Sequence, residues 1–343
     1  MSLYSKIRAR LSTENKGRLS KLLILSGLKP KINKNIVSPF NEGILVFSAD
    51  FEMAWAFRYS KTLASKAVEV GLKERGNVPI LLNLFDKHQI PATWATVGHL
   101  FLNECARNEN GIAHPEIPKP AYFDNRNWLY NSGDWYEQDP CTNAGSDPAW
   151  YAPDLIEQIL SAKANHEIGC HTFSHLDFTY KNCPKVMADA ELEICKTLAD
   201  NKGIRLRSFV FPGGTFGNYE SLKEKGFLCY RKPMKDHIDI PYIDSFGLVA
   251  IPSSLGLDKD PYGWSKEFHL KMIRKFLEKT ITHKLVCHFW FHPSMATWYL
   301  DNVMPEVVRM VGEFRDAGML RVLTMGALAE EFISTHKFIS ETL

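Results

Sequence analysis

Short apolar runs alternate with segments of helical periodicity along most of the chain. Residues 43–50 read Gly-Ile-Leu-Val-Phe-Ser-Ala-Asp, an apolar run with a β-branched centre that predicts a buried strand. From about 77 to 88 the apolar residues recur on one stripe, which predicts a helix. Further strands are predicted at 91–97, 167–170, 207–212, 247–251, 284–291 and 320–323. Further helices are predicted at 153–164, 184–202, 218–226, 264–282, 303–317 and 325–335.

This alternation predicts an α/β fold. Repeated strand-then-helix units with nearly continuous apolar strands are typical of a parallel sheet, either open or closed into a barrel. In such folds the chemistry gathers at the carboxyl ends of the strands. Four titratable side chains fall at predicted strand ends: Asp50, Glu52, His171 and His292. We therefore expect them to lie near one another.

The periodicity fails at about 103–152, inside a predicted catalytic domain of residues 41–336. This segment is rich in Pro, Gly and Asn, and an insertion of this length is usually functional or disordered. Its aromatic residues argue against disorder: they are Tyr122, Phe123, Trp128, Tyr130, Trp135, Tyr136 and Trp150. We predict an ordered cap or groove wall. Whether its aromatic rings also stack on a sugar is left open.

Basic residues are concentrated at the N-terminus. Residues 1–40 carry nine lysines and arginines and one acidic residue, Glu14. We predict a solvated, partly helical extension. The alternative is peripheral contact with an anionic membrane surface or a partner.

The composition narrows the class of protein. With a net charge of +2 and 23% charged residues, the chain has no general attraction for nucleic acid. Its seven cysteines are odd in number and include no Cys-x-x-Cys pattern, which favours buried free thiols in a reducing compartment. The sequence shows neither an apolar signal region nor a span of about 20 apolar residues. We expect a cytoplasmic protein, with association at the inner membrane surface as the variant that the basic N-terminus suggests.

The pair His171 and His175 is the first candidate for a metal site. Two imidazoles four residues apart meet on one face if the backbone is helical, although such a pair also occurs on ordinary polar helix faces. Here the pair follows a predicted buried strand, where neutral nitrogen ligands can hold a divalent metal. The hydroxyls of Thr172 and Ser174 are candidates to orient these ligands.

Asp50 and Glu52 supply acidic groups at the end of the first strand. If the strand continues, both side chains point the same way, and two adjacent carboxylates repel each other unless a cation or a shared proton relieves them. One of them can bind the metal while the other acts as a base. One carboxylate and two histidines leave coordination positions open for water and substrate.

The segment 285–293 carries further candidates. Alternation places His288, Trp290 and His292 on one face, and His292 at the strand end suits a general acid. We interpret His288 as a core histidine. Trp290 is either a core residue or a wall of the substrate site.

Another predicted strand ends at Pro212, Gly213 and Gly214. The glycines let the backbone approach a ligand closely, or they form a plain strand-to-helix turn. Arg58 and Arg231 are candidates to pair with an active-site carboxylate.

Four motifs together resemble the polysaccharide deacetylase family, which is the NodB-homology domain of carbohydrate esterase family four. They are Asp50-Phe-Glu52, His171-Thr-Phe-Ser-His175, Phe209-Val-Phe-Pro212 and Phe291-His292-Pro293. They occur in the family's order. The resemblance implies a distorted (β/α)7-8 barrel and metal-dependent removal of an acetyl group from a sugar.

The resemblance also implies roles for individual residues. Glu52, His171 and His175 would bind the metal, expected to be Zn²⁺, with Asp50 as base and His292 as acid. Pro212, Gly213 and Trp290 are the residues expected at the substrate. The sequence departs from the family in two respects. Phe51 separates the two acids and the second is Glu, so the roles of Asp50 and Glu52 can be exchanged. The arginine usual near the third motif is missing.

The predicted function is metal-dependent hydrolysis of an acetyl group from an N-acetylated sugar, in a surface glycan or its precursor. One alternative is a ring-opening amidohydrolase that acts on a small cyclic amide. The other is a catalytically silent glycan-binding relative, which the missing arginine suggests.

Overall fold

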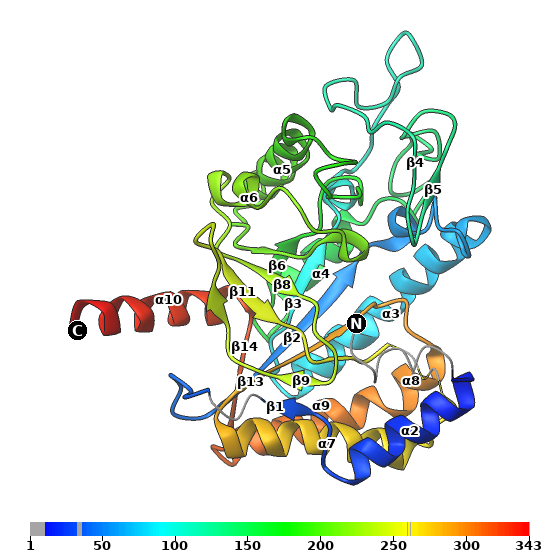
Figure 1. The fold of residues 1–343 in the computed structure, drawn as a ribbon. Helices are drawn as coiled ribbons and strands as arrows, with labels where there is room; N and C mark the ends of the chain where they lie inside the picture. The colour runs from blue at the N-terminus through cyan, green and yellow to red at the C-terminus, as the bar shows by residue number, and fades with distance from the viewer. Residues whose placement is uncertain (1–10, 33–35, 259, 261, 343) are drawn as a thin grey trace.

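The computed structural model describes residues 11–32, 36–258, 260 and 262–342, and Figure 1 shows their arrangement. The strands are β1 (Lys31–Ile32), β2 (Gly43–Phe51), β3 (Thr93–Thr96), β4 (Phe123–Asp124), β5 (Leu129–Tyr130), β6 (Glu167–Cys170), β7 (Ser208–Phe209), β8 (Cys229–Lys232), β9 (His237–Ile238), β10 (Tyr242–Ile243), β11 (Val249–Pro252), β12 (Leu255–Gly256), β13 (Val286–Phe291) and β14 (Leu320–Leu323). The helices are α2 (Thr13–Leu25), α3 (Ala67–Lys87), α4 (Pro153–Ser161), α5 (Lys185–Asp200), α6 (Tyr219–Glu224), α7 (Lys266–His283), α8 (Thr297–Asn302), α9 (Met304–Asp316) and α10 (Met325–Thr342). Short 3₁₀ turns are η1 (Met53–Ala56), η2 (Ala64–Lys66), η3 (Gly98–Phe101) and η4 (Pro212–Gly214).

The main sheet curls into a half-barrel, as in a distorted barrel fold. Its strand order is β10-β11-β8-β7-β6-β3-β2-β13-β12, and β14 pairs with the first half of β2. All these pairings are parallel except that of β10 with β11. The chain runs from β11, which pairs with β8, directly into β12, which pairs with β13. The segment 249–256 therefore joins the two ends of the sheet, and the predicted α/β barrel is confirmed.

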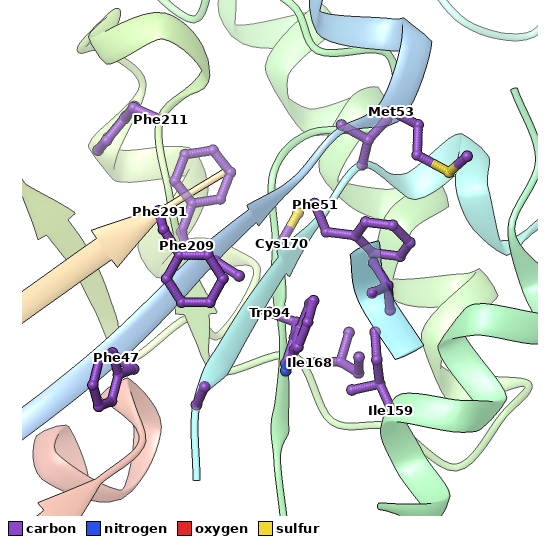
Figure 2. Packing of buried hydrophobic residues seen from close by; sticks show 14 of the residues in the cluster. Phe47, Phe51, Met53, Trp94, Ile159, Ile168, Cys170, Phe209, Phe211 and Phe291 are labelled. Atoms are coloured by element: carbon purple, nitrogen blue, oxygen red, sulfur yellow. The ribbon is translucent and has the colours of Figure 1, made fainter. Parts of the chain in front are cut away.

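The long strand β2 shows how the sequence produces this barrel. Its nine residues are all buried, because alternate side chains enter two different cores. Leu45, Phe47 and Phe51 join the large core between the sheet and the helices, where Phe51 packs at right angles to Trp94 of β3 (Figure 2). Ile44 and Val46 face a smaller core with the first turns of α10. Ser48 and Asp50 continue this second face, so the barrel interior becomes polar toward the strand ends.

The structure differs from the predicted elements in several bounds, and one helix and one strand show why. The helix α3 begins at Ala67, ten residues before the predicted start. The amphipathic pattern hides the first part, because that part buries the polar side chain of Glu74. The strand β8 was not predicted, since only its first two residues are fully buried.

The N-terminal segment packs on the barrel. Along α7, Lys275 Nζ donates to the carbonyl of Ile24 at 2.7 Å and Lys279 Nζ donates to that of Pro30 at 2.7 Å, and α2 lies beside α7 in Figure 1. Residues 13–32 are therefore not a freely solvated extension. The basic residues Lys6, Arg8, Arg10 and Lys34 lie outside the described residues. Among the helices that the structure describes, none is long and apolar enough to cross a membrane.

Candidate active site and metal centre

Glu52, His171 and His175 meet at the carboxyl ends of β2 and β6. Glu52 Oε1 lies 3.0 Å from His171 Nε2 and 3.2 Å from His175 Nε2. All three side chains are buried, and their ligand atoms are close enough to share one metal ion. The structure thus brings together the three side chains that the sequence proposes as metal ligands.

The tautomer of His171 shows that this cluster fits a cation. Its Nδ1 lies 2.7 Å from the carbonyl oxygen of Val210, and a carbonyl can only accept, so Nδ1 carries the proton. In the neutral ring Nε2 then presents a lone pair to the carboxylate of Glu52. Two acceptors at this distance repel each other unless a positive charge lies between them. A divalent metal supplies that charge, and the bond to Val210 is of the kind that orients histidine ligands.

The histidine pair lies on an irregular loop after β6, and its two rings meet without a helical backbone. Residues 171–175 form an irregular loop in which Thr172 and His175 adopt positive φ angles of 59° and 55°. The buried carboxylate of Glu191, on α5, accepts hydrogen bonds from the backbone N–H groups of Phe173 and Ser174. The loop is therefore held by a distant carboxylate, and no local spacing rule could have predicted it.

The hydroxyls next to the histidines also support the loop rather than the rings. Thr172 Oγ1 accepts from the backbone N–H of Leu176, and Ser174 Oγ donates to Glu191. The expectation that they orient the imidazoles directly is wrong.

Asp50 pairs with Arg231 of β8. The two guanidinium nitrogens donate to the two carboxylate oxygens at 2.5 and 2.6 Å, and the same guanidinium donates to Ser48 Oγ at 3.0 Å. Such a bidentate pair fixes the plane of the carboxylate. A cation from β8 thus stands beside Asp50, although the arginine usual near the third motif is absent.

Arg58, the other candidate for this pairing, lies elsewhere. It donates to the carbonyls of Trp55 and Ser174 at 2.6 and 2.8 Å and stacks on the ring of Trp135 at 4.3 Å. It therefore braces the histidine loop against the insertion and does not contact an active-site carboxylate.

His292 faces both carboxylates from the end of β13. Its Nε2 lies 3.9 Å from Asp50 Oδ2 and 3.9 Å from Glu52 Oε1, while Nδ1 lies 2.6 Å from Asp258 Oδ2. Burial alone would lower the pKa of His292, but the charges of Glu52, Asp258 and Asp50 outweigh it and raise the pKa to about 10. The ring is therefore a cation at neutral pH and can donate a proton.

The pKa of Glu52 moves in the opposite direction. Burial alone would raise it, but His175, His292 and His171 outweigh burial and hold the pKa of this carboxyl well below its usual range. Glu52 is thus ionised, as a metal ligand must be.

Glu74 is a supporting residue that sequence reasoning missed. Its Oε1 accepts the backbone N–H groups of Glu52 and Met53 at 2.8 and 3.1 Å, at the sharp turn where Met53 has φ 50°. Burial and the charge of Glu52 raise the pKa of Glu74 to about 8, so a largely neutral carboxyl group holds the turn. Sequence reasoning also missed Asp258, just after β12. Its function depends on contact with His292, which is 34 residues away in the chain.

The site opens into a cavity of about 820 Å³. Asp50, Glu52, His175 and His292 line it, together with Gly213 and Trp290. Pro212, the third expected substrate residue, is the buried first residue of the η4 turn and is not among the lining residues. Trp290 is half-buried, and the guanidinium of Arg231 lies 4.9 Å from its ring centre.

Gly213 is required by packing against the insertion. It has φ 56°, and a Cβ atom there would lie 2.4 Å from the ring of Trp128. The group that approaches the glycine closely is thus a tryptophan of this chain. His288, interpreted as a core histidine, is fully buried with Nε2 at 2.8 Å from Ser48 Oγ.

The aromatic residues of the insertion mostly form its own core. Phe123, Trp128, Tyr130, Trp135, Tyr136 and Trp150 are buried, whereas Tyr122 is 60% exposed. Trp128 is the one of these seven that lines the cavity, where its ring meets His175 at 5.0 Å. Sugar stacking by the other six is therefore not supported.

One family model matches part of the chain. The sequence model of the family described as polysaccharide deacetylase matches residues 68–227. This range contains His171 and His175 but neither Asp50, Glu52 nor His292. None of the curated proteins matches the chain.

Solved structures with the same fold include a candidate polysaccharide deacetylase from Mycobacterium smegmatis. It is 16% identical with a TM-score of 0.59, over 89% of this chain and 96% of that chain. Two others have lower TM-scores of 0.40. The catalytic domain of a peptidoglycan N-acetylglucosamine deacetylase from Eubacterium rectale is 13% identical over 86% of this chain and 94% of that chain. A family 4 carbohydrate esterase from Streptomyces lividans is 12% identical over 82% and 92%.

Proposed function

We propose that this chain, of which residues 68–227 match the model of the polysaccharide deacetylase family, is a metal-dependent hydrolase that removes the acetyl group from an N-acetylated sugar. The proposal rests on one observation. An ionised carboxylate meets two histidines, and a second carboxylate, held by two hydrogen bonds from an arginine, lies beside them. This arrangement places a base and an acid beside a metal site whose three ligands leave coordination positions open.

The geometry favours one division of labour between the two acids. Glu52 faces both imidazoles with one oxygen, whereas both oxygens of Asp50 are engaged by Arg231. We therefore assign Glu52, His171 and His175 as the residues that hold the metal, and Asp50 as the base. A bound Zn²⁺ would polarise the acetyl carbonyl and acidify a water molecule.

The protein side chains then handle the protons. Asp50 accepts a proton from the attacking water, and Arg231 keeps its carboxylate aimed at the cavity. Protonated His292 donates to the departing amine nitrogen, which leaves poorly as an anion. Asp258 holds the ring of His292 from the opposite side at 2.6 Å.

The cavity supports a sugar-sized substrate. Its volume of about 820 Å³ lies within the range of about 300–1,000 Å³ that is usual for small-molecule sites. We further propose that the substrate is a surface glycan precursor, met inside the cell. The cysteines, all of them free thiols, support a reducing compartment.

Acetate release from a panel of N-acetylated sugars tests this proposal. The panel comprises an N-acetylglucosamine oligomer, a nucleotide-linked N-acetylhexosamine and a lipid-linked one, with a small cyclic amide as the competing substrate. We expect acetate from at least one sugar, and a loss of about 1,000-fold in kcat for His171→Ala and Asp50→Ala, because the metal and the base each contribute several kcal/mol.

The matched control is His283→Ala, which removes an exposed histidine at the end of α7. It should leave acetate release unchanged. Ring opening of the cyclic amide without acetate release, or equal rates for wild type and His171→Ala, would contradict the proposal.

A further inference from the structure

A second group of metal-ligating side chains lies in and beside the insertion. His99 belongs to η3, just after β3, and Cys105, His114 and Asp139 come from the irregular segment that follows. We call these four residues the insertion cluster. None of them lines the active-site cavity, so the catalytic mechanism does not use them.

Their ligand atoms all lie within 4.8 Å of one another. Asp139 Oδ2 lies 3.0 Å from His99 Nε2, 3.2 Å from His114 Nε2 and 3.4 Å from Cys105 Sγ. The sulfur of Cys105 lies 3.8 Å from His99 Nε2. Bonds of about 2.0–2.3 Å from Zn²⁺ to nitrogen, oxygen and sulfur give tetrahedral edges of about 3.3–3.8 Å. The observed spacing is close to that of a zinc site.

The ligand groups are oriented from behind. His99 Nδ1 faces the carbonyl of Trp150 at 3.4 Å, which leaves Nε2 to point into the cluster. The second oxygen of Asp139 accepts from the hydroxyl of Tyr151 at 3.2 Å and from the backbone N–H of Cys141 at 2.9 Å. Carbonyl and hydrogen-bond partners of this kind fix the direction of metal ligands.

The surroundings suit a permanently bound ion. His99, His114 and Asp139 are buried. Aromatic rings of η1 and of the insertion lie against them, with Trp55 at 4.2 Å from His99 and Tyr136 at 4.8 Å from His114. Within the insertion, the described regular strands are only β4 and β5, with two residues each. A segment with so little regular structure gains most from a bound ion that crosslinks its ends.

We propose that the insertion cluster binds a divalent transition metal, with Zn²⁺ as the best fit, and that this ion fixes the insertion to the barrel. Nitrogen, sulfur and carboxylate oxygen are all ligands of Zn²⁺, and four protein ligands close its tetrahedral coordination, which leaves no position for substrate. The proposal is independent of the proposed function, because it concerns other residues and another role.

Cobalt substitution tests the site through its thiolate. The full-length protein is stripped of metal with a chelator and reloaded with Co²⁺, and its absorption and metal content are measured. No cysteine belongs to the active-site cluster, so a thiolate-to-cobalt charge-transfer band in the near ultraviolet reports on Cys105 alone. We expect two Co²⁺ per chain and this band in the wild type.

Two variants and one control distinguish the sites. Cys105→Ser should bind one Co²⁺ and lose the band, whereas His171→Ala should bind one Co²⁺ and keep it. Cys141→Ser is the matched control: Cys141 is also a free, half-buried thiol close to Cys105, and its loss should change neither value.

Three outcomes would overturn the proposal. A wild type that binds one Co²⁺ without the band would show that the cluster is only a hydrogen-bonded network. Two oxidised thiols that reappear on reduction would show a disulfide between Cys105 and Cys141 instead. A band that disappears in Cys141→Ser but not in Cys105→Ser would show that Cys141, and not Cys105, supplies the thiolate ligand.

Discussion

The active-site cluster and the insertion cluster contain the same core unit and differ in what completes it. In each, one carboxylate oxygen faces two imidazole Nε2 atoms at 3.0 and 3.2 Å, from Glu52 in the active site and from Asp139 in the insertion. In the insertion a thiol closes the fourth corner. In the active site that side faces the cavity and the ring of His292.

This difference suits the active-site cluster to catalysis and the insertion cluster to structural support. An open coordination position allows water and substrate to bind, whereas four protein ligands exclude both. The supporting residues differ in the same way. Asp50, Arg231 and Asp258 place charges around the open cluster, while the closed cluster is surrounded by aromatic rings and backbone groups. Substitutions should therefore affect kcat at one cluster and folding stability at the other.

Outside the metal ligands and the base themselves, the largest effect on catalysis is expected when Asp50 loses its pairing with Arg231. In Arg231→Met the carboxylate of Asp50 stays buried without its cation, and its orientation is no longer fixed. We expect kcat for acetate release to fall about 100-fold, with the metal content unchanged. The measurement is steady-state kinetics together with metal analysis of the same folded sample.

Arg231→Lys provides the graded control. A lysine keeps the charge but loses the bidentate geometry, so kcat should fall by about tenfold. If Arg231→Met kept kcat within a factor of two, the pairing would have no part in catalysis.

A smaller effect is expected on the pH dependence. His292 must be protonated to act as an acid, so activity is present below its pKa and is lost as the pH rises through it. Burial lowers this pKa, but Glu52, Asp258 and Asp50 together raise it to about 10. Asp258→Asn removes one of these charges, and the alkaline limb of kcat/KM should move down by about one pH unit, a tenfold loss on that limb.

Asp260→Asn is the matched control for this shift. Asp260 lies two residues further along and pairs with His269 at 3.5 Å, so its removal changes the net charge equally without touching His292. An alkaline limb that moves equally in both variants would mean that Asp258 acts only through the overall charge of the cavity.

The sequence predicted those parts of the molecule in which local pattern decides the structure. Four candidate residues follow apolar runs that predict strands: Asp50, Glu52, His171 and His292. They were expected near one another because parallel strands bring their carboxyl ends to one rim. The pairing of Asp50 with Arg231 spans 181 positions, so periodicity could only propose two candidates, and tertiary contact selected one. Spacing alone left the backbone of the histidine loop open, and the contact with Glu191 fixes its irregular conformation.

The insertion cluster escaped prediction for a related reason. Its ligands are separated by six, nine and twenty-five positions in a segment without periodicity, so no spacing rule connects them. Compact sites such as the histidine pair can be found from spacing. Sites assembled by an irregular segment become visible only when the fold places their atoms together.

The smallest effect on catalysis, and a clear effect on stability, is expected from Cys105→Ser. Loss of the closing thiolate should release the ion of the insertion cluster. An ion present at about 1,000 times its dissociation constant contributes about 4 kcal/mol to the free energy of unfolding, so we expect Tm to fall by about 5 °C. At a temperature well below Tm, kcat should stay within twofold of the wild type, because the open cluster keeps all its ligands. Calorimetry and acetate release on one sample, with Cys141→Ser beside it, provide the measurement. A large loss of kcat without a fall in Tm would mean that the two clusters are not separated into catalytic and structural roles. The insertion cluster would then control the geometry of the active-site cluster through the insertion.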